Sequence, residues 1–281
     1  MEDVEVFELD NQQDEADVEE IVDNLTLFDD DLMSRVFDKN IEATELFLGI
    51  VLERKIKVIS VDGQDEMKNP EVGGRNITLD VHAIDENKQE IDIEVQGNSK
   101  GAHIRRARYH SGMVDSRMLK EGQDFKELKD SYIIFMYKHD KFGKGLPMYH
   151  IDRYVRETNE LFEDGSHIIY VNGKYKGDDP LGQLVSDFHQ KKSDKMHYKE
   201  LAAGVKHFKE TEEGREIMCE SVERYAKSYG DKRAKRATQE TAVDIFLRMI
   251  KEGIPKETAQ RIAKISDELV EKALNQSVKT V

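Results

Sequence analysis

Residues 76–96, which read NITLDVHAIDENKQEIDIEVQ, decide the fold. Apolar and polar residues alternate on both sides of an Asp-Glu-Asn turn at 85–87, so this stretch predicts two strands joined as a hairpin. One face of each strand is polar, with Thr78, Asp80 and His82 on the first and Asp92, Glu94 and Gln96 on the second. Each strand therefore has one apolar face to bury and one polar face.

The segments around the hairpin predict an α/β protein. Residues 31–52 have apolar residues at helical spacing with a break at 38–40, which predicts one helix or two short ones. Residues 56–61, 131–137 and 167–171 are typical of strands, and residues 98–120 of a helix. We expect an α/β core over residues 25–195, with helices packed on a central sheet, and a helical C-terminal region over residues 196–281. In that region the sequence predicts helices over 196–206, 215–228, 238–251 and 256–275.

The net charge of -15 opposes nucleic-acid binding at first sight, because Lys and Arg side chains drive phosphate binding. Residues 1–31, however, contain fourteen Asp or Glu and no Lys or Arg, so the other 250 residues carry about -1. Residues 1–24 are acidic and poor in apolar residues, which predicts a disordered arm. The charge of the remaining chain does not exclude a nucleic-acid partner.

The composition of the chain also predicts its location in the cell. The sequence has no apolar run near the roughly 18 residues of a membrane span, so no membrane partner is expected. The amino terminus lacks a basic segment followed by an apolar one, and the single cysteine, Cys219, fits a reducing compartment. A cytoplasmic location is expected.

The polar face of the hairpin predicts a metal site. Asp80 and Glu94 lie on adjacent strands, so their carboxylates can converge, and the Val95 carbonyl offers a further oxygen. Oxygen ligands suit Mg²⁺, with Mn²⁺ as an alternative. Gln96 shares the face of Glu94 and could position a water molecule. Spacing alone leaves a second interpretation open, because acidic residues on the solvated face of a hairpin are common.

Asp80, thirteen intervening residues and then Glu94-Val95-Gln96 resemble the motif of the PD-(D/E)XK nucleases. The chain is most similar to the branch of nuclease-family transposases, or recombination-promoting nucleases, in which the second strand carries Glu-x-Gln. Further similar segments lie at 31–37, 105–109, 132–136, 167–173 and 250–254. The resemblance spans about residues 28–275 and implies a restriction-endonuclease-like core, a central mixed sheet flanked by helices.

What the resemblance implies about function is a Mg²⁺-dependent endodeoxyribonuclease, with DNA as its partner. Asp80 and Glu94 would be metal ligands with the Val95 carbonyl, and Gln96 would position water. Asp31, at the start of the first helix, would be a more distant acid near the metal. Recombination or mobile-element biology is the implied setting, and a homodimer is an added expectation if both strands are cut symmetrically.

The chain departs from the family pattern at two positions. Leu79 stands where a proline usually precedes the aspartate, and Gln96 stands in the place of the lysine. An amide can orient water but cannot accept its proton, so deprotonation would fall to metal-bound hydroxide or to a substrate phosphate.

A basic stretch follows the motif. Arg105, Arg106, Arg108 and Tyr109 are the residues expected to bind DNA, and they lie in the helix predicted over 98–120. The same residues could instead form a solvated helix face paired with local acids.

Two other classes of function stay open. A catalytically inactive DNA-binding or protein-interaction module could use the same fold, and it would bind metal or DNA without cleavage. An unrelated α/β enzyme could use the paired acids for general acid-base chemistry, without magnesium dependence or DNA affinity.

Overall fold

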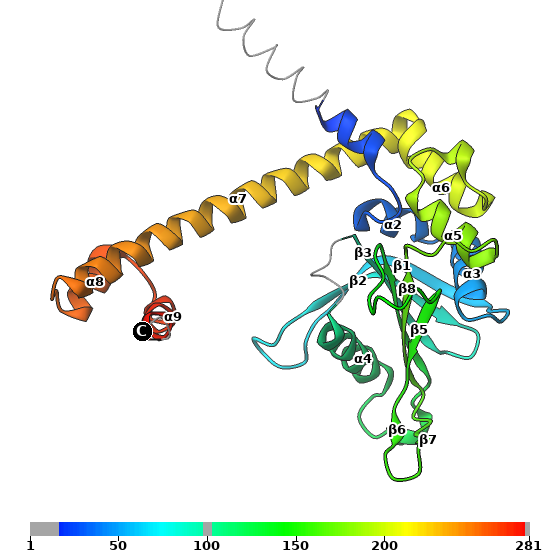
Figure 1. The fold of residues 1–281 in the computed structure, drawn as a ribbon, viewed down its shortest axis with the longest axis horizontal. Helices are drawn as coiled ribbons and strands as arrows, with labels where there is room; N and C mark the ends of the chain where they lie inside the picture. The colour runs from blue at the N-terminus through cyan, green and yellow to red at the C-terminus, as the bar shows by residue number, and fades with distance from the viewer. Residues whose placement is uncertain (1–16, 98–102, 279–281) are drawn as a thin grey trace, which may run out of the picture. The chain divides into compact units, whose positions relative to one another are not determined.

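The computed structural model describes residues 17–97 and 103–278 (Figure 1). The chain divides into two compact units, the first ending at Cys219 and the second beginning at Glu220. This boundary lies later than the expected end of the core at 195, because α6 (Lys199–Glu210) packs on α2 (Asp30–Phe37) of the first unit. Gly204 permits this close approach, since a Cβ there would lie 2.7 Å from Val36 Cγ1.

A mixed six-stranded sheet forms the centre of the first unit, in the order β1-β2-β3-β4-β8-β5. Its strands are β1 (Val58–Met67), β2 (Ile77–Asp85), β3 (Glu90–Gln96), β4 (Ser131–Tyr137), β5 (Met148–Ile151) and β8 (Ser166–Asn172). The predicted hairpin is confirmed as the antiparallel pair β2 and β3, with Val81 opposite Ile93. Strands β3, β4 and β8 run parallel, so their carboxyl ends lie at one edge of the sheet. A separate two-stranded ribbon consists of β6 (Tyr154–Val155) and β7 (Glu160–Leu161).

Both faces of the sheet are covered, as a sheet with parallel strands requires. Helix α4 (Ile104–Met118) contributes Ala107 and Val114 to a core with Phe135 and Tyr170. Ile134 alternates with Phe135 along β4 and is also buried, so the opposite face is covered too. The expected mixed sheet flanked by helices is therefore confirmed.

The helices at the start of the chain contact the sheet and one another. Helix α2 contacts β1, β2 and β3, and α3 (Ile41–Val51) contacts β1 and α5 (Pro180–His189), as Figure 1 illustrates. The break predicted at 38–40 separates α2 from α3, because Lys39 adopts a left-handed conformation with φ 56°. Asn40 then caps α3 by accepting a hydrogen bond from the Ala43 N–H.

Residues 17–24 form a helix, in which Val22 is buried. The predicted acidic arm covered residues 1–24, and its residues 1–16 lie outside the described part of the chain. The remaining short elements of the first unit are the 3₁₀ turns η1 (Phe125–Glu127) and η2 (Ser193–Lys195).

The second unit is helical, as predicted for the C-terminal region. It contains the later part of α7 (Glu212–Lys251), α8 (Lys256–Ala263) and α9 (Asp267–Val278). One long helix replaces the two predicted between 215 and 251. The helix predicted over 256–275 is instead two helices, because Lys264 ends α8 in the left-handed conformation with φ 52°. Phe246, Ala259, Ile265 and Val270 are buried in a common core.

In neither stretch that the structure describes, 17–97 or 103–278, is there a helix with the length and apolar character needed to cross a membrane.

A buried lysine joins three separate segments of the first unit. The Lys209 side chain donates hydrogen bonds to the carbonyls of Asp23 (3.0 Å), Leu25 (2.6 Å) and Lys191 (2.6 Å). Lys209 is only 5% exposed, and burial lowers its pKa to about 8. The charge is therefore retained at neutral pH, where it satisfies three backbone acceptors that would otherwise lack donors.

We expect Lys209→Met to lower the free energy of unfolding by roughly 3 kcal/mol, because each unsatisfied buried acceptor costs about 1–3 kcal/mol. Urea denaturation followed by circular dichroism measures the change. Lys206→Met, at an exposed position of the same helix, is the matched control and should stay within about 0.5 kcal/mol of the wild type. Equal stability of the two variants would contradict this role for Lys209.

Candidate functional site

Strands β2 and β3 bring Asp80 and Glu94 together. The Asp80 N–H donates to Glu94 Oε1 (3.2 Å), and the Val95 N–H donates to Asp80 Oδ2 (2.9 Å). Asp80 is 7% exposed and Glu94 is fully buried. The two carboxyl groups predicted to converge are therefore held together by backbone hydrogen bonds, with Asp80 the closer of the two to solvent.

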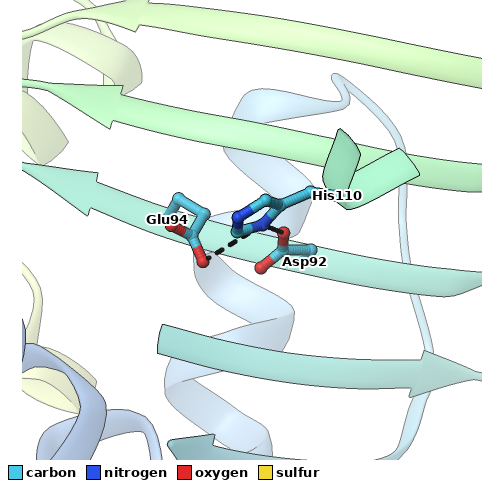
Figure 2. A group of neighbouring side chains, drawn as sticks. All are labelled: Asp92, Glu94 and His110. Carbon is cyan, nitrogen blue, oxygen red and sulfur yellow. Dashed lines mark hydrogen bonds and ion pairs between the residues drawn. The ribbon is translucent and has the colours of Figure 1, made fainter. Parts of the chain in front are cut away.

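A third carboxyl group and an imidazole join this pair (Figure 2). Asp92, two residues before Glu94 on β3, lies on the same face of the strand, and His110 contacts both from α4. His110 Nδ1 lies 2.8 Å from Asp92 Oδ2 and 3.6 Å from Glu94 Oε1. One ligand atom from each of the three lies within 4.8 Å of the others. The second carboxylate oxygen of Asp92 is buried without a hydrogen-bond partner among the described residues.

Arg106 supplies a positive charge to the group. Its guanidinium forms an ion pair with Glu94 Oε2, and its Nε donates to His110 Nε2 (3.3 Å). Because His110 Nδ1 already faces Asp92, the two ring nitrogens of His110 connect the carboxylate to the guanidinium. The orientation of Arg106 is thus fixed by Glu94 and His110 rather than by solvent.

Burial controls the protonation of these groups. It raises the pKa of Asp80 to about 8, with a further contribution from the charge of Glu94. Burial likewise raises the pKa of Glu94 to about 8, with the charge of Asp92 adding to the effect and Arg106 opposing it. The pKa of Asp92 is also raised, again chiefly by burial, while burial lowers the pKa of His110. Three carboxyl groups that resist ionisation would therefore ionise more readily beside an added cation.

Comparison with known proteins identifies the family. The model of the PD-(D/E)XK nuclease family transposases matches residues 34–175, half of the chain, and this range contains Asp80, Glu94 and α4. The chain belongs to this family. No curated protein and no solved structure matches it.

The donor set of this PD-(D/E)XK chain fits a divalent metal ion, the kind of cofactor that nucleases of this type use. Carboxylates and a neutral imidazole are suitable ligands, and the raised pKa values of the carboxyls would fall on metal binding. The unpartnered oxygen of Asp92 is a further acceptor at the same place. Two overlapping sets share Glu94: the predicted one with Asp80, and a deeper one with Asp92 and His110.

The other residues predicted for the metal site, Gln96 and Asp31, have different contacts. Gln96 is half-buried at the end of β3, and its carbonyl accepts from the Lys138 N–H (3.0 Å). Asp31 faces Arg35 on its own helix, at 3.6 Å. Its neighbour Asp30 is the acid whose charge helps to raise the pKa of Asp80. The charge of Asp30 at the start of α2 thus acts on Asp80, and the role of Asp31 near the metal stays a prediction.

The residues predicted to bind DNA separate into three groups. Arg105 and Arg108 are exposed on α4. Arg106 is directed to Glu94. Tyr109 donates from its hydroxyl to the Arg75 carbonyl (2.6 Å) and accepts from Asn69 (2.8 Å), so it holds the segment between β1 and β2. Arg105 and Arg108 are the two arginines here that remain directed to solvent.

Asp92 and His110 are not among the site residues that the sequence predicts. Asp92 stood in the same alternation as Glu94, and His110 lay four residues after Arg106, so both were on the expected faces of their elements. Nothing in the local pattern says that α4 packs against β3 at this point.

Because Asp80 and Glu94 titrate near pH 4 when unfolded and near pH 8 when folded, the folded protein binds more protons between those values. Without metal, the stability contributed by these groups is complete below about pH 4 and is lost as pH rises toward about 8, by up to about 1.4 kcal/mol per pH unit for each group. Asp80→Asn and Glu94→Gln should each flatten this slope.

Urea unfolding in EDTA across this range measures the slope. Glu42→Gln, at an exposed position of α3, is the control and should retain the wild-type dependence. Identical slopes in all four proteins would show that the two carboxyls titrate alike in the folded and unfolded states.

Proposed function

We propose that this PD-(D/E)XK protein is an endonuclease that hydrolyses phosphodiester bonds of DNA with Mg²⁺. The observation that carries the proposal is the contact between Asp80 and Glu94, which two backbone hydrogen bonds hold in place on adjacent strands. Mn²⁺ has the same preference for oxygen ligands and should replace Mg²⁺.

Of the two overlapping ligand sets, Asp80 and Glu94 with the Val95 carbonyl are the better suited to catalysis. Mg²⁺ usually keeps several waters and also contacts substrate phosphate, so its site needs an open side. Asp92 is fully buried and His110 is 3% exposed, whereas Asp80 is 7% exposed. Asp92 and His110 would therefore hold Glu94 and Arg106 in position without themselves binding the catalytic ion.

Each residue then has a distinct role. When bound, the ion polarises the scissile phosphate and acidifies water. Gln96, on the same face of β3 as Glu94, orients the attacking water through its amide. Asp30 adds negative charge that acts on Asp80, and Asp31 is a less favoured candidate for that role because it faces Arg35.

DNA is the proposed partner. Arg105 and Arg108 are exposed on α4, the helix that carries Arg106 and His110, and would contact the phosphate backbone. Tyr109 would act indirectly, by holding the Asn69 and Arg75 segment. Cleavage in recombination or mobile-element transfer is the setting that the family name favours. The cytoplasmic location and the homodimer remain predictions.

A second function, an inactive DNA-binding or protein-interaction module, has one observation in its favour. The Arg106 guanidinium already forms an ion pair with Glu94, so a metal ion must compete with the Arg106 side chain for this carboxyl group. The motif lysine is also replaced, by Gln96. A module of this kind would bind DNA but would not cut it.

Cleavage of supercoiled plasmid separates the two functions. The wild type should nick DNA with Mg²⁺ or Mn²⁺ and stop in EDTA, and Asp80→Ala or Glu94→Ala should lower the rate at least ~100-fold, because several kcal/mol of transition-state stabilisation are lost. Asp62→Ala, at a half-exposed position of β1, is the control. Intact plasmid with wild type and metal, despite DNA binding, would favour the inactive module.

Asp92→Asn tests the supporting role of the deeper carboxyl. It keeps the size of the side chain but removes the charge beside His110, so we expect cleavage to fall by about 10–100-fold, as for other residues that orient metal ligands. Part of the loss should be recovered at higher Mn²⁺ concentration. A loss as complete as that of Asp80→Ala, with no recovery, would instead make Asp92 a direct ligand.

A further inference from the structure

Two lysine-rich loops follow neighbouring parallel strands of the sheet. The loop after β4 begins Lys138-His139-Asp140-Lys141-Phe142-Gly143-Lys144, and the loop after β8 begins Gly173-Lys174-Tyr175-Lys176-Gly177. Both start at the carboxyl ends of their strands, where β3 also ends after Glu94 and Gln96. In sheets with parallel strands, this edge is where ligands commonly bind.

The register of the strands relates these loops to the candidate metal site. Gln96 pairs with Tyr137, and Tyr137 pairs with Asn172. Neighbouring strands lie about 4.8 Å apart, so the loop after β8 begins about 10 Å across the sheet from Gln96. That span corresponds to about three base pairs along duplex DNA.

Two of the three acids of these loops, Asp140 and Asp179, accept hydrogen bonds within the loops. Asp140 accepts from the N–H groups of Gly143 (2.9 Å) and Gly145 (2.7 Å) and from the Tyr149 hydroxyl (2.6 Å). Asp179 caps α5 by accepting from the Gly182 N–H (2.8 Å). The side chains of Lys144, Lys174 and Lys176 are exposed. The edge of the sheet formed by these two loops, which we call the rim, therefore directs the positive charge of these lysines to solvent in a protein of net charge -15.

A cavity of about 610 Å³ lies beneath the loop after β8. Lys174, Lys176 and His197 line it together with one acid, Asp178. The buried carboxylate of Asp187 holds His197 Nδ1 at 2.7 Å, while the His197 side chain is 43% exposed. Its Nε2 makes no hydrogen bond with a residue in the described part of the chain. The cavity thus presents two ammonium groups and an oriented imidazole.

We propose that this rim, centred on Lys174, Lys176 and His197, binds a backbone phosphate of the duplex DNA that is cut at the candidate metal site. The lysines neutralise the phosphate, and His197 in its protonated form donates from Nδ1 to Asp187 and from Nε2 to the phosphate. The position of the cut bond rests on the proposed nuclease function, whereas binding at the rim does not.

Binding of a short fluorescent duplex, measured in Ca²⁺ at several salt concentrations, tests the rim. Removing the two lysines that neutralise one backbone phosphate should weaken binding and lower the slope of log K against log salt by about 1. The variant is Lys174→Gln/Lys176→Gln. Its control is Lys126→Gln/Lys129→Gln, at exposed positions before the amino end of β4, which should match the wild type.

Unchanged affinity and slope in the Lys174 and Lys176 variant would overturn the inference, as would binding that depends solely on a terminal 5′-phosphate of the duplex. Plasmid cleavage by the same proteins keeps the two proposals apart. Lysine-dependent binding without cleavage by the wild type would support the rim and reject the nuclease. Cleavage by the wild type with lysine-independent binding would reject the rim alone.

Discussion

Burial of three carboxyl groups beside a single guanidinium is the constraint on which this structure depends. Asp80, Asp92 and Glu94 are all nearly or fully buried, and moving ionised carboxylates out of water is costly unless they are paired or protonated. Arg106 forms an ion pair with Glu94, His110 forms a hydrogen bond with Asp92, and both residues come from α4. The docking of α4 on the sheet is therefore an electrostatic requirement as well as a source of apolar burial through Ala107 and Val114.

This arrangement has a consequence for function. A site with raised pKa values is poorly ionised until a cation arrives, so metal binding and carboxyl ionisation are coupled. Arg106 offsets part of the charge in the absence of metal, at the expense of competing with it for Glu94. The replacement of the motif lysine by Gln96 removes a second cation from the same region. With one fixed positive charge fewer at the motif, stabilisation of the ionised carboxylates depends more on a bound metal ion and on Arg106.

The charge of the chain is distributed unevenly, and the distribution matters more than the total. Acidic residues concentrate in the first 31 positions and in the buried site, whereas exposed lysines follow the parallel strands β4 and β8. Phosphate binding depends on local cations, so an overall acidic protein can still present a surface for DNA. The parallel pairing of β3, β4 and β8 brings the acidic site and the basic loops to one edge of the sheet.

The sequence by itself determined the hairpin, because alternation with a period of two is a local property of the chain. It also determined that Asp80 and Glu94 would lie on adjacent strands, and the break at 38–40 between the first two helices. Only the tertiary structure decided that Asp92 and His110 join them, that Arg106 turns inward, and that the charge of Asp30 acts on Asp80. These outcomes depend on how α2 and α4 dock on the sheet, and docking is set by burial between segments distant in sequence, which no local period records.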